Sequence, residues 1–224
     1  MGQQNLEMGL ATPKRYVPVD SQIYIGGQKA QSGKRMLADY RSTVGKDYST
    51  AKYRNKNQIL RSMLKRAINY GLQFTLTIVA DSWFGNKENI KAVLSEKLTG
   101  IFRMRQGNLL YSLNSRRYTA TELYALVKRR MKRLKGTCYR TVTLNVHLDL
   151  SNDKKNPDLR LVKLLFSTSA KQQNENWVLF LSTFINRYFS FPTEDSGNIC
   201  ASLGDRDLLQ RSKAALWSAE RTDR

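Results

Sequence analysis

The stretch that most constrains the fold is residues 75–85, which read TLTIVADSWFG. Apolar, β-branched residues that end at a polar break are typical of a buried β-strand. Helical patterns flank the stretch, over residues 57–70 and 86–97, and this alternation predicts a strand within an α/β sheet. Asp81 then stands just past the C-terminal end of the strand, where open α/β sheets place their ligands. The alternative is that Asp81 caps the following helix.

The composition indicates a globular chain that binds a polyanion. The 224 residues suffice for one sizeable domain with a core, and the hydrophobic content is 41%. Lys and Arg number 38 against 18 Asp and Glu, which gives a net charge of +20. Nucleic acid is the usual partner of such a chain, and an anionic membrane surface is the rival. The basic residues are spread along the whole sequence, which favours a broad surface that follows phosphates.

Two further observations narrow the class of protein. Cys138 and Cys200 lie far apart and match no metal or disulfide framework, which fits a reducing cytosol. No apolar run approaches the roughly 18 residues that a membrane span requires. We therefore expect no membrane-embedded segment.

The patterns predict an order of elements along the chain. Residues 26–56 are polar and aperiodic and predict a long basic loop. In the strand at 100–106, Arg103 and Arg105 share one face by the two-residue alternation. A hairpin is expected around Asn114 and Ser115. Further strands are expected at residues 16–25, 138–150, 159–167 and 177–182, and helices at 57–70, 86–97 and 121–134.

The last of these helices is expected to end in a dense basic run. Residues 128–135 read KRRMKRLK, which contains six cations. Such a run can be a solvated helix face favoured by the C-terminal dipole. Because the whole chain is basic, we favour contact with phosphates instead. The candidate DNA-binding residues of this run are Lys128, Arg129, Arg130, Lys132 and Arg133.

The sequence changes character near its end. His147, the only histidine, lies on a predicted strand and receives no functional role. Beyond Thr183 the periodicity fades, and residues 208–215 give only a weak helical signal. We therefore expect two parts, a domain over residues 1–183 and a weakly structured tail over residues 184–224.

The combined motifs resemble insertion-sequence DDE transposases with an RNase-H-like catalytic domain. The resemblance is carried by VADSWFG with a helix on each side and by the strand WVLFLST, and it spans about residues 10–183. It implies an α/β fold in which flanking helices cover an RNase-H-like mixed sheet. The fold is expected to be incomplete and to contain an inserted or extended β region.

The resemblance also implies a chemistry. In that family three carboxylates hold divalent metal ions, Mg²⁺ or Mn²⁺, and Asp81 takes the position of the second. Arg103 and Arg105 are then candidate phosphate contacts. The implied activity is cut-and-paste DNA transposition at transposon ends in the bacterial cytoplasm, close to the nucleoid. The implied partners are DNA, a second copy of the chain, or an intact transposase in a mixed oligomer.

The sequence departs from the family at the other two carboxylates. The first family Asp lies on a strand before the segment that YVPVDSQIY resembles, and we expect this chain to lack that strand. Asp20 lies within the later strand and does not replace it. The family Glu, in a helix with a Tyr, Arg, Glu, Lys signature soon after FLST, is also missing.

A frameshift offers an explanation for the missing Glu. Codons for residues 197–213 can be chosen so that the frame shifted by one nucleotide encodes Glu-Ile-Tyr-Ala-Arg-Arg-Trp-Glu-Ile-Glu-Thr-Phe-Phe-Lys, then two residues and a Lys. This contains the family pattern of Tyr, two residues, Arg, three residues, Glu, six residues and Lys. The glutamate codon then straddles Arg206 and Asp207. The hypothesis is that a frameshift between Ser182 and about Asp195 replaced the catalytic helix with an out-of-frame tail.

Two functions follow as alternatives. The first is a degenerate DDE transposase that is impaired in catalysis, because one carboxylate supplies too few ligands for two dications. The second is a non-catalytic basic DNA-binding protein that competes with an intact transposase. A protein of the membrane surface is a weaker third alternative, because no basic amphipathic helix with bulky aromatic anchors is evident.

Overall fold

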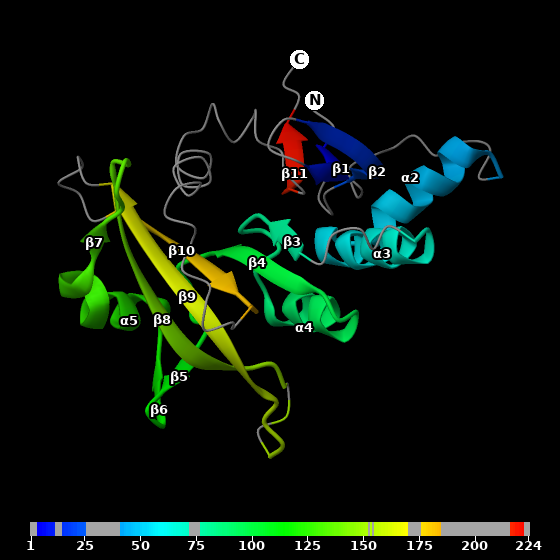
Figure 1. Cartoon of the computed structure of the whole chain (residues 1–224). Coiled ribbons are helices and arrows are strands. Elements are labelled where there is room, and N and C mark those ends of the chain that lie inside the picture. Colours follow the sequence, from blue (N-terminus) through cyan, green and yellow to red (C-terminus); the bar gives the residue numbers. More distant parts are fainter. Residues whose placement is uncertain are drawn as a thin grey trace. The chain divides into compact units, whose positions relative to one another are not determined.

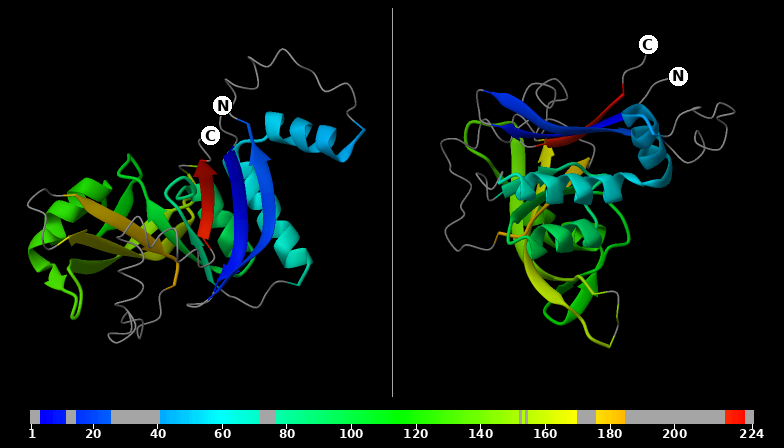
Figure 2. Two further views of the ribbon diagram at one scale, coloured as in Figure 1. Left: turned by 90° about the horizontal axis from the view of Figure 1, so that it is seen from above. Right: turned by 90° about the vertical axis from the view of Figure 1, so that its right-hand side faces the viewer.

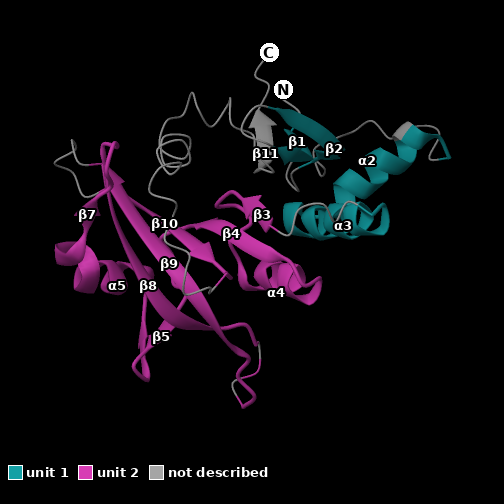
Figure 3. Ribbon diagram, viewed as in Figure 1, with its two compact units in different colours: residues 1–75, 213–224 teal, residues 76–212 magenta. Residues whose placement is uncertain are grey.

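The computed structural model describes residues 4–11, 15–25, 41–71, 77–151, 153, 155–169, 176–184 and 216–221. The chain divides into two compact units (Figure 3). Unit 1 contains residues 1–75 and 213–224, and unit 2 contains residues 76–212. Helices accompany strands in both units, and the sheet of unit 2 is mixed. The predicted α/β architecture, a mixed sheet with flanking helices, is confirmed.

The strands of unit 1 form an antiparallel group. β1 (Gln4–Ala11) pairs with β2 (Tyr16–Tyr24) on one side and with β11 (Leu216–Arg221) on the other (Figure 2). β2 is the strand expected at residues 16–25. The sequence analysis did not predict β1, although its apolar residues Leu6, Met8 and Leu10 stand at every second position. Leu6 is its one fully buried large side chain.

Two helices accompany these strands, and α3 (Lys56–Asn69) matches its prediction. Asn55 and Gln58 form a capping box at its start, in which the Asn55 side chain accepts from the Gln58 amide at 2.8 Å. Its predicted apolar face is buried. The buried residues are Ile59, Leu60, Met63, Leu64 and Ala67.

The other helix corrects the sequence analysis. α2 (Thr43–Tyr53) lies inside the segment for which a basic loop was predicted, so that prediction is wrong for these residues. The Ser42 side chain caps the helix by accepting from the Gly45 amide at 3.1 Å, and Ala51 is buried. A helix with so little apolar periodicity depends on its cap and its packing against β2, which a sequence pattern does not reveal. Residues 26–40 lie outside the described residues.

An ion pair joins β2 to α3. Both Nε and Nη2 of Arg66 donate to Oδ2 of Asp20, at 3.0 and 2.7 Å. Asp20 therefore has a structural partner inside unit 1.

Unit 2 is built on a long mixed sheet (Figure 1). Its strand order is β3-β4-β10-β9-β8-β5-β6, with β7 also paired to β8. Among the described strands of this unit, β3 and β4 pair in parallel and the others pair antiparallel. The predicted inserted or extended β region corresponds to the antiparallel part. The strands are β3 (Thr77–Ala80), β4 (Thr99–Met104), β5 (Tyr111–Leu113), β6 (Arg116–Tyr118), β7 (Lys132–Arg133), β8 (Tyr139–Asp149), β9 (Leu159–Ser169) and β10 (Trp177–Ser182).

The hairpin between β5 and β6 turns at the predicted residues. Asn114 and Ser115 have φ angles of 49° and 65°, the left-handed conformation that two-residue hairpin turns of type I′ require. The strand positions predicted from alternation are confirmed as well, because Val146 and Leu148 of β8 are buried while His147 between them is exposed.

Helix α5 (Ala120–Val127) contributes to the core of the antiparallel region. The ring of Tyr124 stacks on Trp177 of β10 with centroids 4.8 Å apart and lies 5.9 Å from Phe166 of β9. Leu123 of the same helix is fully buried, whereas Leu126 is 54% exposed. The helix therefore packs one face into the core and presents the other to solvent.

The expected tail over residues 184–224 falls largely outside the described residues. These include residues 208–215, where a weak helix was predicted. Phe184 and β11 are the described parts of this segment. The division into residues 1–183 and 184–224 remains a prediction.

The two leucines of α5 give a matched test of this core. Leu123→Ala removes a fully buried side chain and should lower the free energy of unfolding by about 2–5 kcal/mol. Leu126→Ala makes the same change on the exposed face and should alter it by no more than about 0.5 kcal/mol. Urea denaturation followed by circular dichroism measures both, and equal losses would contradict the described packing.

Candidate active site

Asp81 follows directly on β3, at the end of the strand where a ligand was expected. β3 runs parallel to β4, and Ala80 lies opposite Phe102 in the pairing register. The next residues, Asp81 and Arg103, are therefore level with each other. The C-terminal ends of the two parallel strands lie at one edge of the sheet, so this edge presents a carboxylate beside a cation.

Asp81 does not cap the next helix, so the capping alternative is wrong. The cap of α4 (Lys87–Ser95) is Asn86, whose side-chain oxygen accepts from the Asn89 amide at 3.0 Å. Asp81 instead accepts a hydrogen bond at Oδ1 from the Ser82 amide, and its carbonyl accepts from the Phe84 amide at 2.9 Å. Its carboxylate is thereby held within a tight turn.

Close packing fixes this turn against β4. Phe84 is 1% exposed, and the fully buried Asn89 donates from Nδ2 to its carbonyl at 3.1 Å. At Gly85 a Cβ would lie 2.6 Å from the Arg103 carbonyl oxygen and 2.9 Å from Met104 Sδ. Only glycine allows so close an approach to the strand.

The turn presents an aromatic side chain that the sequence analysis overlooked. Trp83 is 54% exposed, and the Arg105 guanidinium carbon lies 4.0 Å from the centroid of its ring. Arg105 stands just beyond β4 and was predicted to contact phosphate together with Arg103. Parallel pairing of the two strands was the missing information, because it brings DSWF and the end of β4 to the same edge.

The described residues around Asp81 do not form a metal centre. Among them, no group of three or more His, Cys, Asp or Glu side chains is placed to hold a metal ion. Asp149 of unit 2 is engaged in its own loop, where its Oδ1 accepts from the hydroxyl of Ser151 at 2.7 Å, from the Ser151 amide at 2.9 Å and from the Asp158 amide at 3.1 Å. The bonds from Ser151 hold the pKa of the Asp149 carboxyl below its ordinary value. A single carboxylate does not match the donor set that Mg²⁺ or Mn²⁺ requires.

The basic run folds differently from its prediction. α5 ends at Val127, and the run continues as a 3₁₀ turn, η1 (Lys128–Arg130), and the short strand β7. An extended α-helix would place cations four residues apart on one face, as at Lys128 and Lys132, and such pairs are destabilising. The prediction of a helix to residue 134 is therefore wrong. The basic side chains are nevertheless all exposed, namely Lys128, Arg129, Arg130, Lys132, Arg133 and Lys135.

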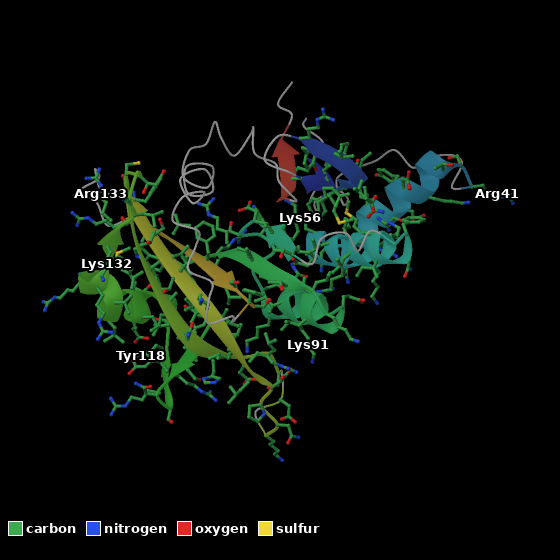
Figure 4. The ribbon with its side chains drawn as sticks, viewed as in Figure 1. Arg41, Lys56, Lys91, Tyr118, Lys132 and Arg133 are labelled. Atoms are coloured by element: carbon green, nitrogen blue, oxygen red, sulfur yellow. The ribbon has the colours of Figure 1, made fainter. Side chains whose placement is uncertain are left out.

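Strand pairing concentrates the charge of this run further. β7 pairs with β8 so that Arg133 lies directly opposite Arg140. Figure 4 labels Lys132 and Arg133, the two residues of β7. Like charges that face each other across two strands are destabilising, and an anion that binds between them removes the penalty. One donor of the Arg133 guanidinium is used within the turn, because Nε donates a hydrogen bond to the Thr137 carbonyl at 3.2 Å.

The family comparison agrees with the fold. The model of the DDE superfamily endonucleases matches residues 1–141, well over half of the chain. The chain belongs to this family. Its mixed α/β fold is consistent with an RNase-H-like DDE endonuclease domain, for which DNA is the substrate. No curated protein and no solved structure gives a significant match.

None of the helices in the described part of the chain has the length and apolar character that crossing a bilayer requires.

Two glycines test the packing of the turn. Gly85→Ala forces a methyl group against the backbone of β4 and should lower the free energy of unfolding by about 1–3 kcal/mol. Gly107→Ala is the control, because a Cβ there meets nothing within 4 Å. Thermal unfolding of both variants checks this, and an unchanged melting temperature for Gly85→Ala would show that the turn is looser than described.

Proposed function

We propose that this chain is a DNA-binding protein of the DSWF type of insertion-sequence DDE transposases, with weak or absent strand-cleavage activity. The observation that carries the proposal is that Asp81, to which we assign the position of the family's second Asp, follows β3 without a cluster of acidic partners among the described residues. The family supplies DNA as the substrate class, and the charge of the chain supports binding to it.

Binding follows from charge alone. A net charge of +20 favours a polyanion at long range, and each Lys or Arg that neutralises a phosphate releases a condensed counterion. Within unit 2, the exposed side chains of Lys128, Arg129, Arg130, Lys132 and Arg133 are proposed to contact phosphates. Arg103, level with Asp81, would hold a phosphate close to the carboxylate.

Strand cleavage requires more carboxylate ligands for metal ions than the described residues bring together around Asp81. DDE superfamily endonucleases generally use divalent metal ions, which activate the attacking oxygen and stabilise the leaving one. Holding two such ions close together takes several carboxylates, whereas one carboxylate supplies too little charge and too few oxygens. Asp81 is the residue that would contribute to such a site, and we propose that metal binding there is weak.

The frameshift remains part of the proposal. It accounts for the missing Glu, which in the shifted frame would be encoded across the codons of Arg206 and Asp207. The gene sequence tests it directly. The shifted frame should run without a stop codon through Trp-Glu-Ile-Glu, with coding for the first Asp strand upstream and terminal inverted repeats around the gene. Stop codons in the shifted frame would refute this part of the proposal.

A second function is favoured by the combination of exposed cations with an isolated carboxylate. Such a chain occupies transposon ends without cutting them, and so competes with an intact transposase for DNA or joins it in mixed oligomers. This activity would be located in the bacterial cytoplasm, at the nucleoid.

One experiment measures DNA binding and strand cleavage separately. Linear DNA that carries the ends of the source element is incubated with the full chain and with Asp81→Ala, with Mg²⁺ or Mn²⁺. We expect both proteins to bind, with affinity that falls steeply between about 50 and 200 mM salt. We expect no nicks above background from either protein. Robust nicking that Asp81→Ala abolishes would overturn the impaired-enzyme proposal.

A further inference from the structure

We propose that Trp83 and Arg105 form a platform on which an unpaired nucleobase of bound DNA stacks, beside Asp81. The proposal rests on DNA being the ligand of this chain, and it adds a specific mode of recognition that phosphate contacts do not provide. Its basis is the position of the Arg105 guanidinium carbon over the indole ring, 4.0 Å from the ring centroid, at the same sheet edge as the carboxylate.

The platform is built before any ligand binds. The turn that carries Trp83 is fixed by the buried Phe84 and Asn89 and by the close contact of Gly85 with the backbone of β4. Arg105 follows the end of that same strand. Both halves of the platform therefore stand on one parallel strand pair, and little conformational entropy remains to be lost when a ring stacks on it.

The exposure of Trp83 points to a ligand with a flat face. Even with the guanidinium over its ring, the residue is 54% exposed, in a turn whose neighbour Phe84 is buried. Indole and guanidinium are both planar groups on which nucleobases stack, and the guanidinium also pairs with phosphate oxygens. A single nucleotide carries both a base, which can stack, and an adjacent phosphate, which can pair with the guanidinium.

The geometry favours an unpaired base over an intact duplex. Inside a duplex, neighbouring base pairs cover the faces of each base, and the grooves expose only the edges. An aromatic platform therefore selects a strand end, a frayed pair or a flipped nucleotide. Because Trp83 is two residues from Asp81, the selected base would lie close to the phosphate at the carboxylate.

The probes are two DNA molecules of equal length that contain 2-aminopurine, one with the analogue in a four-nucleotide single-stranded overhang and one with it inside a blunt duplex. Fluorescence anisotropy gives the affinity for each, and quenching of 2-aminopurine reports stacking. The wild-type chain should bind the overhang about tenfold more tightly than the blunt duplex and quench its fluorescence.

Trp83→Ala should remove both the preference and the quenching while affinity for the blunt duplex stays within about twofold, and Trp83→Phe should retain part of each. The matched control is Tyr53→Ala, which removes another exposed aromatic ring that has a cation, Lys52 Nζ, 5.6 Å from its centroid. This variant should behave like the wild type. Circular dichroism confirms that each variant is folded.

The outcomes separate the two proposals. If Trp83→Ala keeps the full preference and quenching, or if the wild type binds both DNA molecules equally without quenching, the platform is refuted and DNA binding stands. If the wild type binds neither DNA molecule at low salt, the proposed function fails and the platform fails with it.

Discussion

The parallel pairing of β3 with β4 is the constraint on which the rest of the site depends. Parallel strands end on the same side of a sheet, so the residues after β3 and the residues at the end of β4 come together whatever separates them in sequence. Gly85 then lets the turn after β3 rest on the backbone of β4. A carboxylate, a tryptophan and two arginines are thereby gathered at one edge by backbone geometry alone.

This dependence explains which parts of the structure the sequence could predict. β3, α3 and α4 carry strong local patterns, and so does β8, whose alternation predicted its buried face. β9 and β10 were predicted from apolar runs. The position of Asp81 followed from the strand that precedes it. The stack of Trp83 on Arg105 could not be predicted in the same way, because it depends on which strands are neighbours. Periodicity along one strand contains no such information.

The errors have related causes. α2 has few apolar residues at helical spacing, and a side-chain cap with tertiary packing supplies what the pattern lacks. In the basic run the error was to predict too much helix. The helical pattern was extended to residue 134, although the repulsion between neighbouring cations in this run opposes a helix. There the chain takes up a short turn and a two-residue strand that pairs with β8.

The effect of Asp81 on a nearby phosphate depends on the charges around it. A carboxylate among cations repels a phosphate unless a metal ion lies between them, because two anions at close range raise each other's energy where water is scarce. With several carboxylates, a DDE site converts this repulsion into metal-mediated attraction. With one carboxylate, the balance of charge moves toward Arg103 and Arg105, which are the proposed phosphate contacts, and the proposed base contact at Trp83 does not depend on charge. This balance is the physical reason for proposing that the edge retains DNA more readily than it cleaves it.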